Sequence, residues 1–171
     1  KEAYDEAIRD IDQALRLKPD YVDALINRGI VYRQKREYDR AIQDFDQAIR
    51  LKPTAAEGWN ERCWTRAIAG RLQEALADCD EGLRLEPDHL EARDSRAFTF
   101  LKLGQVDRAI TEYDAVLRVD PEKPFSLYGR GLARRRKGDI AGGEADMAAA
   151  KAIKPDIAEK FAEIGMRPDN P

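Results

Sequence analysis

The sequence predicts an all-α fold, a right-handed superhelical solenoid built from antiparallel helix pairs. Five prolines recur at intervals of 34 residues, at Pro19, Pro53, Pro87, Pro121 and Pro155. A period of this length is typical of stacked helix–turn–helix units. Apolar residues follow one another at three- and four-residue steps, which is the spacing of one helix face, and no segment alternates with a period of two. We therefore expect helices throughout and no β-sheet.

The prolines divide the chain when each is placed at position 32 of its unit. Residues 1–21 are then a half repeat, the complete repeats are 22–55, 56–89, 90–123 and 124–157, and residues 158–171 are a C-terminal capping helix and tail. We expect residues 1–171 to form a single repeat domain. The chain begins inside a unit and without methionine, so we expect a segment to precede Lys1.

Each unit contributes helices that the sequence delimits in order. The half repeat supplies one helix, with an apolar stripe at Ala7, Ile11 and Ala14. Each proline follows a helix that it cannot continue. Within a repeat, glycines one period apart mark the turn between its two helices, because glycine tolerates the left-handed backbone that ends a helix. These are Gly70, Gly104 and Gly138, with Arg36 in place of glycine in repeat 22–55. The expected helices lie near 3–17, 22–35, 38–51, 56–69, 72–85, 90–103, 106–119, 124–137, 140–153 and 157–164.

Small and large residues recur at fixed positions of the unit. Position 8 reads Gly29, Cys63, Ala97 and Gly131, position 20 reads Ala7, Ala41, Ala75, Ala109 and Gly143, and position 24 reads Ile11, Phe45, Cys79, Tyr113 and Met147. This pattern resembles the tetratricopeptide repeat family over nearly the whole chain. Positions 7 and 11 depart from the family pattern. Arginine stands at position 7 in all four complete repeats, and position 11 reads Tyr32, Arg66, Phe100 and Arg134.

The position 7 arginines lie beside the predicted seam between helices, where a guanidinium requires an acceptor. They are Arg28, Arg62, Arg96 and Arg130. Acidic pairs recur at positions 23 and 25 of the facing helices, as Asp10/Asp12, Asp44/Asp46, Asp78/Asp80 and Glu112/Asp114. A carboxylate accepts two parallel hydrogen bonds from arginine. We therefore expect a ladder of Arg–carboxylate pairs, within or between adjacent repeats, in preference to an anion-binding row or a calcium site.

Two cysteines, Cys63 and Cys79, hold packing positions on facing helices of one repeat. The sequence leaves two alternatives open: a disulfide, or two buried thiols that act as small apolar fillers. A disulfide implies an oxidising compartment such as a bacterial periplasm, and the periplasm is expected only if this bond forms; otherwise the bacterial cytoplasm is expected. No apolar run approaches the roughly 20 residues of a membrane span.

The resemblance also implies a concave groove lined by positions 2, 5, 6, 9, 12 and 13 of the first helices. The corresponding residues are Asp23, Ile26, Asn27, Ile30, Glu57, Asn60, Glu61, Trp64, Glu91, Asp94, Phe98, Leu101, Phe125, Tyr128 and Leu132. The position 9 row, which includes Trp64 and Phe98, is interpreted as an exposed apolar stripe. The alternative is that both aromatic residues fill the interior of the groove.

The predicted function is that of a non-enzymatic adaptor that binds a peptide or helix of a partner protein. An acidic rim and an apolar floor favour a partner with basic and apolar residues. The alternatives are a docking or regulatory module of a larger protein, and a self-associating module that pairs through its first helix. No catalytic or cofactor motif is evident, and with a single histidine, His89, no histidine-based metal cluster is expected.

Nucleic-acid binding is not expected at a net charge of −3. The basic run 134–137 is either an anionic-partner patch or a helix C-terminus whose cations favour the helix dipole.

Overall fold

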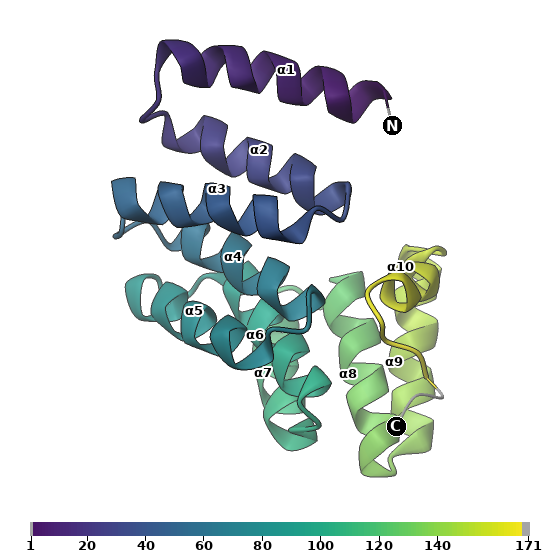
Figure 1. Ribbon diagram of the computed structural model, residues 1–171. Coiled ribbons are helices and arrows are strands. Elements are labelled where there is room, and N and C mark those ends of the chain that lie inside the picture. The colour runs from purple at the N-terminus through teal and green to yellow at the C-terminus, as the bar shows by residue number, and fades with distance from the viewer. Residues whose placement is uncertain (1, 169–171) are drawn as a thin grey trace. The chain divides into compact units, whose positions relative to one another are not determined.

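The computed structural model describes residues 2–168 and consists, over those residues, of helices joined by short turns (Figure 1). The helices are α1 (Glu2–Leu17), α2 (Val22–Gln34), α3 (Tyr38–Leu51), α4 (Ala56–Ile68), α5 (Leu72–Leu85), α6 (Leu90–Lys102), α7 (Val106–Val119), α8 (Pro124–Lys137), α9 (Ile140–Ile153) and α10 (Ile157–Glu163). Every helix expected from the sequence is therefore confirmed, with ends within about two residues. The tail predicted at 158–171 is described only as far as Pro168.

The chain divides into two compact units, residues 1–92 (unit 1) and residues 93–171 (unit 2). The boundary falls within α6, whose first turn belongs to unit 1. Consecutive helices pack as antiparallel neighbours in each unit, with α2 against α3 and α4 against α5 in unit 1, and α8 against α9 in unit 2 (Figure 1). None of the described helices is long and apolar enough to cross a membrane.

The core of unit 1 follows the small-and-large alternation of the repeat. Leu25, Ala41 and Phe45 are almost completely buried between α2 and α3. Gly29 allows this contact, because a Cβ at that position would lie 2.6 Å from the Phe45 ring. The small residue at position 8 is thus matched to the large residue at position 24 of the next helix.

The core of unit 2 brings two helix backbones closer still. A Cβ added to Gly143 would lie 2.7 Å from the carbonyl oxygen of Gly131, and one added to Gly131 would lie 2.8 Å from the carbonyl oxygen of Gly143. Glycine at both positions therefore lets α8 and α9 pack directly against each other, with Met147 beside the contact.

The turns within repeats close as the glycine pattern predicts. Gly70, Gly104 and Gly138 have φ values of 85°, 72° and 95°, and Arg36 adopts the same left-handed region at φ 63°. In each turn, the following amide donates to a carbonyl of the last helical turn, as from Arg71 to Arg66 at 2.8 Å. The non-glycine residue at Arg36 carries the strain that left-handed backbone imposes on a side chain.

The last turn between helix pairs differs from the earlier ones. Tyr21, Ala55 and Lys123 precede their helices in extended conformation, with ψ of 92°, 113° and 104°. Asp156 precedes α10 with ψ of 4°, and Ile157, the counterpart of those extended residues, is already helical. Because the extended residue sets the direction of the next helix, α10 leaves this turn differently. It lies where α8 begins and α9 ends (Figure 1).

Candidate functional site

Arginine at position 7 joins three helices in unit 1. Arg28 on α2 donates two hydrogen bonds to Asp44 on α3, through Nε at 2.8 Å and Nη2 at 2.7 Å. Its Nη1 donates to Asp12 on α1 at 2.7 Å. The guanidinium is thus bound both by its own repeat and by the preceding one, as the predicted ladder requires.

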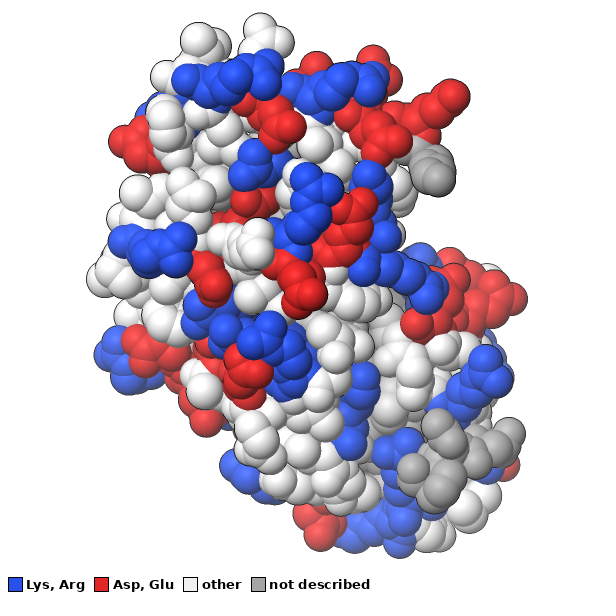
Figure 2. All heavy atoms as spheres, in the orientation of Figure 1, with Lys and Arg blue, Asp and Glu red and all other residues white. Residues whose placement is uncertain are grey.

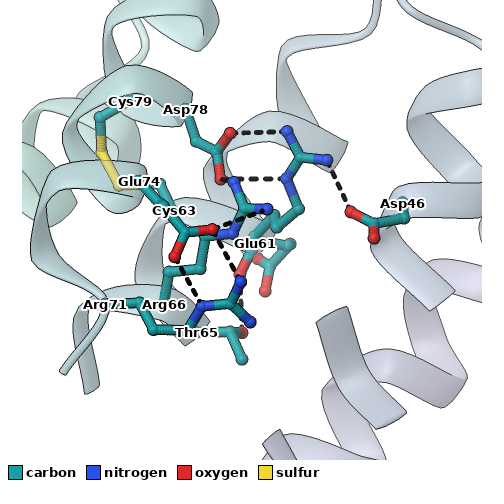
Figure 3. Close-up of polar contacts among 10 residues, drawn as sticks. Asp46, Glu61, Cys63, Thr65, Arg66, Arg71, Glu74, Asp78 and Cys79 are labelled. Atoms are coloured by element: carbon teal, nitrogen blue, oxygen red, sulfur yellow. Dashed lines mark hydrogen bonds and ion pairs between the residues drawn. A yellow bond between two sulfur atoms is a disulfide. The ribbon is translucent and has the colours of Figure 1, made fainter. Parts of the chain in front are cut away.

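The next step of the ladder surrounds Asp78, whose side chain is only 3% exposed. Arg62 donates to both carboxylate oxygens of Asp78, at 3.0 and 2.6 Å, and to Asp46 of the preceding repeat at 2.6 Å. Arg66, at position 11, adds a third bond to Asp78 at 2.6 Å (Figure 3). Two arginines therefore share one buried carboxylate.

Unit 2 repeats this arrangement. Arg130 donates two bonds to Asp146, both 2.7 Å long, and one to Asp114 at 2.8 Å. Arg96 donates to Glu112 at 2.7 Å. The ladder predicted from positions 7, 23 and 25 is therefore confirmed in both units.

The ladder holds its guanidinium groups in the charged state. The hydrogen bonds to Asp44 and to Asp146 raise the pKa of Arg28 and of Arg130. Desolvation acts to lower the pKa of Arg62, but the bonds to Asp78 and Asp46 outweigh it and the pKa is raised. The recurring acidic pairs thus compensate arginine charges.

The residue at position 11 is either aromatic or arginine, and the two kinds make different contacts. Where it is aromatic, an arginine of the following helix lies over the ring, with Arg40 at 4.1 Å from the centroid of Tyr32 and Arg108 at 3.9 Å from that of Phe100. Where it is arginine, the side chain pairs with the acid at position 23, as Arg134 does with Asp146 at 3.0 Å. Either choice places one guanidinium at this point of the repeat.

The two cysteines form a disulfide between α4 and α5, with Cys63 and Cys79 Cα atoms 5.4 Å apart (Figure 3). Both residues are fully buried. Of the two alternatives that the sequence left open, the disulfide is therefore the one in the structure.

The groove positions of unit 1 are largely accessible, and we refer to them as the acidic face. Asp23, Asn27, Glu57 and Glu91 are exposed, Ile30, Glu61 and Trp64 are partly exposed, and Ile26 and Asn60 are buried. Arg33 on α2 pairs with Glu61 on α4, which places these two first helices side by side. Asp23 and Glu57 have no ion-pair partner among residues 2–168. Their charge faces solvent.

The groove positions of unit 2 are mostly buried, and we refer to them as the aromatic face. Phe98, Leu101, Tyr128 and Leu132 are at most 2% exposed. The expectation that Phe98 belongs to an exposed stripe is therefore wrong, and the alternative, an aromatic residue that fills the interior, is correct for this position. Phe125 is partly exposed.

A residue of α10 occupies the aromatic face. The ring of Phe161 stacks on Phe125 with centroids 4.5 Å apart, and lies 4.7 Å from Tyr128 and 6.1 Å from Phe98. Phe161 itself is fully buried. The predicted capping helix is thus folded onto the groove positions of its own unit.

Asp94, the remaining acid predicted for this groove, is used internally. It is 6% exposed, accepts a hydrogen bond of 2.6 Å from the Ser126 hydroxyl and pairs with Lys123 at 3.0 Å. Its charge is therefore compensated within unit 2.

The repeat geometry agrees with a comparison to known families. Residues 2–56, 36–89 and 96–156 match the family model described as tetratricopeptide repeat. The chain belongs to the tetratricopeptide repeat (TPR) family. Members of this family generally mediate protein–protein interactions and are typically non-enzymatic.

Solved structures of other TPR proteins share the fold. The type IV pilus biogenesis factor PilW has a TM-score of 0.82 at 21% identity, over 95% of this chain and 79% of PilW. A thermophilic TPR protein of Thermus thermophilus has a TM-score of 0.80 at 18% identity, over 94% and 90% of the two chains. YrrB, described as a TPR protein with an unusual peptide-binding site, has a TM-score of 0.67 at 22% identity, over 95% and 84%. A comparison with curated protein sequences gives no match.

The basic run at the end of α8 is structural in this TPR protein. Arg134 pairs with Asp146 at 3.0 Å, Arg135 with Glu144 at 3.0 Å and Lys137 with Asp107 at 2.7 Å. Arg136 donates to the carbonyl oxygen of Leu101 at 3.0 Å. On the face shown in Figure 2, cationic and anionic side chains likewise alternate over short distances.

Sequence reasoning identified Phe161 as part of a cap but missed its place among the groove positions. Ile157 and Phe161, four residues apart, are both buried, and they set the register of α10 one residue earlier than the repeat period would place it. That four-residue spacing is the signal that could have indicated which side of the helix packs on unit 2.

Proposed function

We propose that this TPR protein is an adaptor whose acidic face, in unit 1, binds a peptide or helix of a partner protein that carries basic and apolar residues. The observation that carries the proposal is the pair of exposed acids without ion-pair partners, Asp23 and Glu57, on the same face as the partly exposed Ile30 and Trp64. Membership of the TPR family, and the peptide-binding site named for YrrB, support a protein ligand.

The two kinds of side chain have separate roles in this proposal. The acids attract a cationic segment and raise its association rate, an effect that salt screens. The Trp64 ring supplies contact area at low entropic cost, because an aromatic side chain has few rotatable bonds. Arg33 and Glu61 compensate each other's charges, so the attraction comes from Asp23 and Glu57.

The disulfide supports an oxidising compartment for this function. Disulfides persist in the bacterial periplasm and in extracellular space and are rare in the cytosol. The Cys63–Cys79 bond is consistent with a periplasmic adaptor.

A pair of synthetic peptides tests the proposal. One consists of alternating lysine and leucine residues and the other of alternating glutamate and leucine, at equal length. We expect the wild-type chain to bind the lysine peptide at least tenfold more tightly by fluorescence anisotropy, with weaker binding at high salt. Charge reversal with Asp23→Lys and Glu57→Lys should abolish this preference, whereas Asp39→Lys, on the exposed side of α3, should preserve it.

The apolar contribution is tested separately with Trp64→Ala. We expect at least tenfold weaker binding of the lysine peptide with unchanged helical circular dichroism. Equal affinity for the two peptides in the wild type would contradict the acidic face as a site. Loss of helical content in Trp64→Ala would show instead that the indole belongs to the core.

A further inference from the structure

The C-terminal helix α10 has the features of a bound ligand. It carries three almost completely buried residues, Ile157 (2% exposed), Phe161 (0%) and, just after it, Met166 (3%). Its remaining surface, including Glu159, Lys160 and Glu163, is exposed. The segment thus presents one narrow apolar stripe to unit 2 and turns charged residues to solvent, as amphipathic helices do when they dock in grooves.

The attachment of α10 is almost purely apolar. No ion pair or side-chain hydrogen bond joins residues 157–168 to α6–α9 within the described chain. The side-chain charges near its start pair locally, Lys160 with Asp156 at 3.4 Å and Lys154 with Asp156 at 3.7 Å. Asp156 makes no side-chain capping bond. Every other helix of unit 2, by contrast, is tied to a neighbour by the arginine ladder or by Asp94.

A helix of this length has little stability of its own. It spans 7 residues, well below the roughly 12–15 at which isolated helices become marginal in water. Its order therefore depends on the contacts of Phe161 with Phe125, Tyr128 and Phe98. An element held this way opens more readily than the rest of its unit.

We propose that the aromatic face of unit 2 is a second docking site, that α10 is its resident ligand, and that a partner helix with the same Ile-x-x-x-Phe spacing competes with α10 for it. The pocket made by Phe98, Phe125 and Tyr128 receives the phenylalanine, and the partner displaces Phe161. This site is distinct from the acidic face of unit 1, since its lining is aromatic and its resident ligand is bound without ion pairs.

The covalent link between α9 and α10 explains why α10 occupies the site in preference to a partner helix. A linked segment experiences an effective concentration in the millimolar range, so a free partner of equal intrinsic affinity binds only in proportion to the open fraction. In the closed state, therefore, only a helix of higher intrinsic affinity, one that is longer or better packed, displaces α10. A substitution that raises the open fraction of α10 should strengthen the binding of a separate partner helix by the factor by which the open fraction rises.

The probe is a labelled synthetic peptide with the sequence of residues 154–168, which contains Ile157 and Phe161, and the control probe carries alanine at the phenylalanine position. Each is titrated into the full chain. We expect Phe161→Ala to bind the first peptide at least tenfold more tightly than the wild type, because its own α10 no longer fills the pocket, and the control peptide to bind neither chain.

A second variant pair loosens α10 without changing the pocket. Lys160 is exposed, so Lys160→Gly lowers helix propensity and Lys160→Ala preserves it. The glycine variant should bind the peptide about fivefold more tightly than the alanine variant, the factor that about 1 kcal/mol of propensity corresponds to.

Two results would overturn the proposal. One is a folded Phe161→Ala chain, with wild-type circular dichroism, that binds the peptide no better than the wild type. The other is equal affinity for the phenylalanine and alanine peptides. If Phe161→Ala loses its helical signal, the ratio between Lys160→Gly and Lys160→Ala decides, and a ratio of one rejects the resident-ligand model.

Discussion

Units 1 and 2 differ at repeat position 9. In unit 1 this position leaves Ile30 and Trp64 partly exposed, whereas in unit 2 it buries Phe98 and Leu132, and the Phe161 ring lies 6.1 Å from that of Phe98. The difference shows that a repeat position determines which face a side chain lies on, while the neighbouring segment determines whether that face meets solvent. The acidic face is the proposed site for a partner protein, whereas the aromatic face is already filled by Phe161.

The units also differ in how they hold their helix pairs together. Unit 1 joins α4 to α5 with the Cys63–Cys79 disulfide. Unit 2 has no cysteine and packs α8 on α9 through Gly131 and Gly143. What the units share is the arginine ladder. Both tryptophans, Trp59 and Trp64, lie in unit 1, so tryptophan fluorescence reports that unit and circular dichroism reports both.

The largest expected effect falls on the shared ladder. Asp78→Ala in unit 1 and Asp146→Ala in unit 2 each leave two arginines without their common carboxylate. We expect each to lower the free energy of unfolding by about 3 kcal/mol, since removing one partner of a buried pair strands the other charge. Urea denaturation measures the change. Glu81→Ala, which breaks an exposed pair with Arg84, should change the free energy of unfolding far less, because solvent screens that pair.

Reduction of the disulfide should lower the stability of unit 1 and leave that of unit 2 unchanged. Its sequence separation is 16 residues, for which the chain-entropy model gives about 3 kcal/mol. A reductant should therefore shift the urea midpoint of the tryptophan signal, while amide exchange in α8 and α9 stays unchanged. A Cys63→Ala, Cys79→Ala double variant should no longer respond to the reductant. Equal responses of both units would show that the bond does not act locally.

Replacing a helical glycine by alanine should lower the stability in unit 2 and raise it in unit 1. Gly143→Ala forces a Cβ within 2.7 Å of the Gly131 carbonyl oxygen, and we expect a loss of about 2 kcal/mol. Gly82→Ala in unit 1 places its Cβ no closer than 3.6 Å to any neighbour, so the higher helix propensity of alanine should stabilise by up to about 1 kcal/mol. Thermal and urea unfolding measure both, and a Gly143→Ala chain as stable as the wild type would contradict the close approach of α8 and α9.

The smallest effect concerns one buried hydroxyl in unit 2. Tyr113 is fully buried and its hydroxyl has no hydrogen-bond partner among the described residues, whereas the same position in repeat 22–55 is Phe45. Tyr113→Phe should therefore stabilise the chain by about 1 kcal/mol.

The pH dependence of stability provides the control for this substitution. Burial raises the pKa of Tyr113 well above its usual value. The folded state then keeps a proton that the unfolded state releases above about pH 10, so stability is full below that pH and falls as the pH rises further. The phenylalanine variant should lose part of this alkaline decline. An unchanged decline would show that Tyr113 does not contribute to it.

The sequence was sufficient for the helices and for the ladder, because both depend on features that repeat. Proline and glycine spacing determined the turns, and the registers of Arg28 and Asp44 placed a cation opposite an acid on facing helices. Local backbone preferences and fixed helix geometry carry that information.

The exposure of the groove positions could not be obtained this way. The environment of Phe98 depends on α10, which is distant in sequence and departs from the repeat period at Ile157. Likewise, cysteine spacing alone allowed either two thiols or a bond, and the 5.4 Å between the Cα atoms of Cys63 and Cys79 became known only from the structure. Contacts that do not recur with the repeat period determine the exposure of the groove positions and the pairing of the cysteines.

The turn before α10 has a consequence for how such proteins evolve. Repeat proteins change length by duplication, and a new pair stacks only if its first helix continues in the direction of the earlier ones. Tyr21, Ala55 and Lys123 are extended, with ψ of 92° to 113°, whereas their counterpart Ile157 is already helical. The backbone of this one residue thus turns α10 onto unit 2. An extended backbone at Ile157 would instead give α10 the direction that the earlier first helices have.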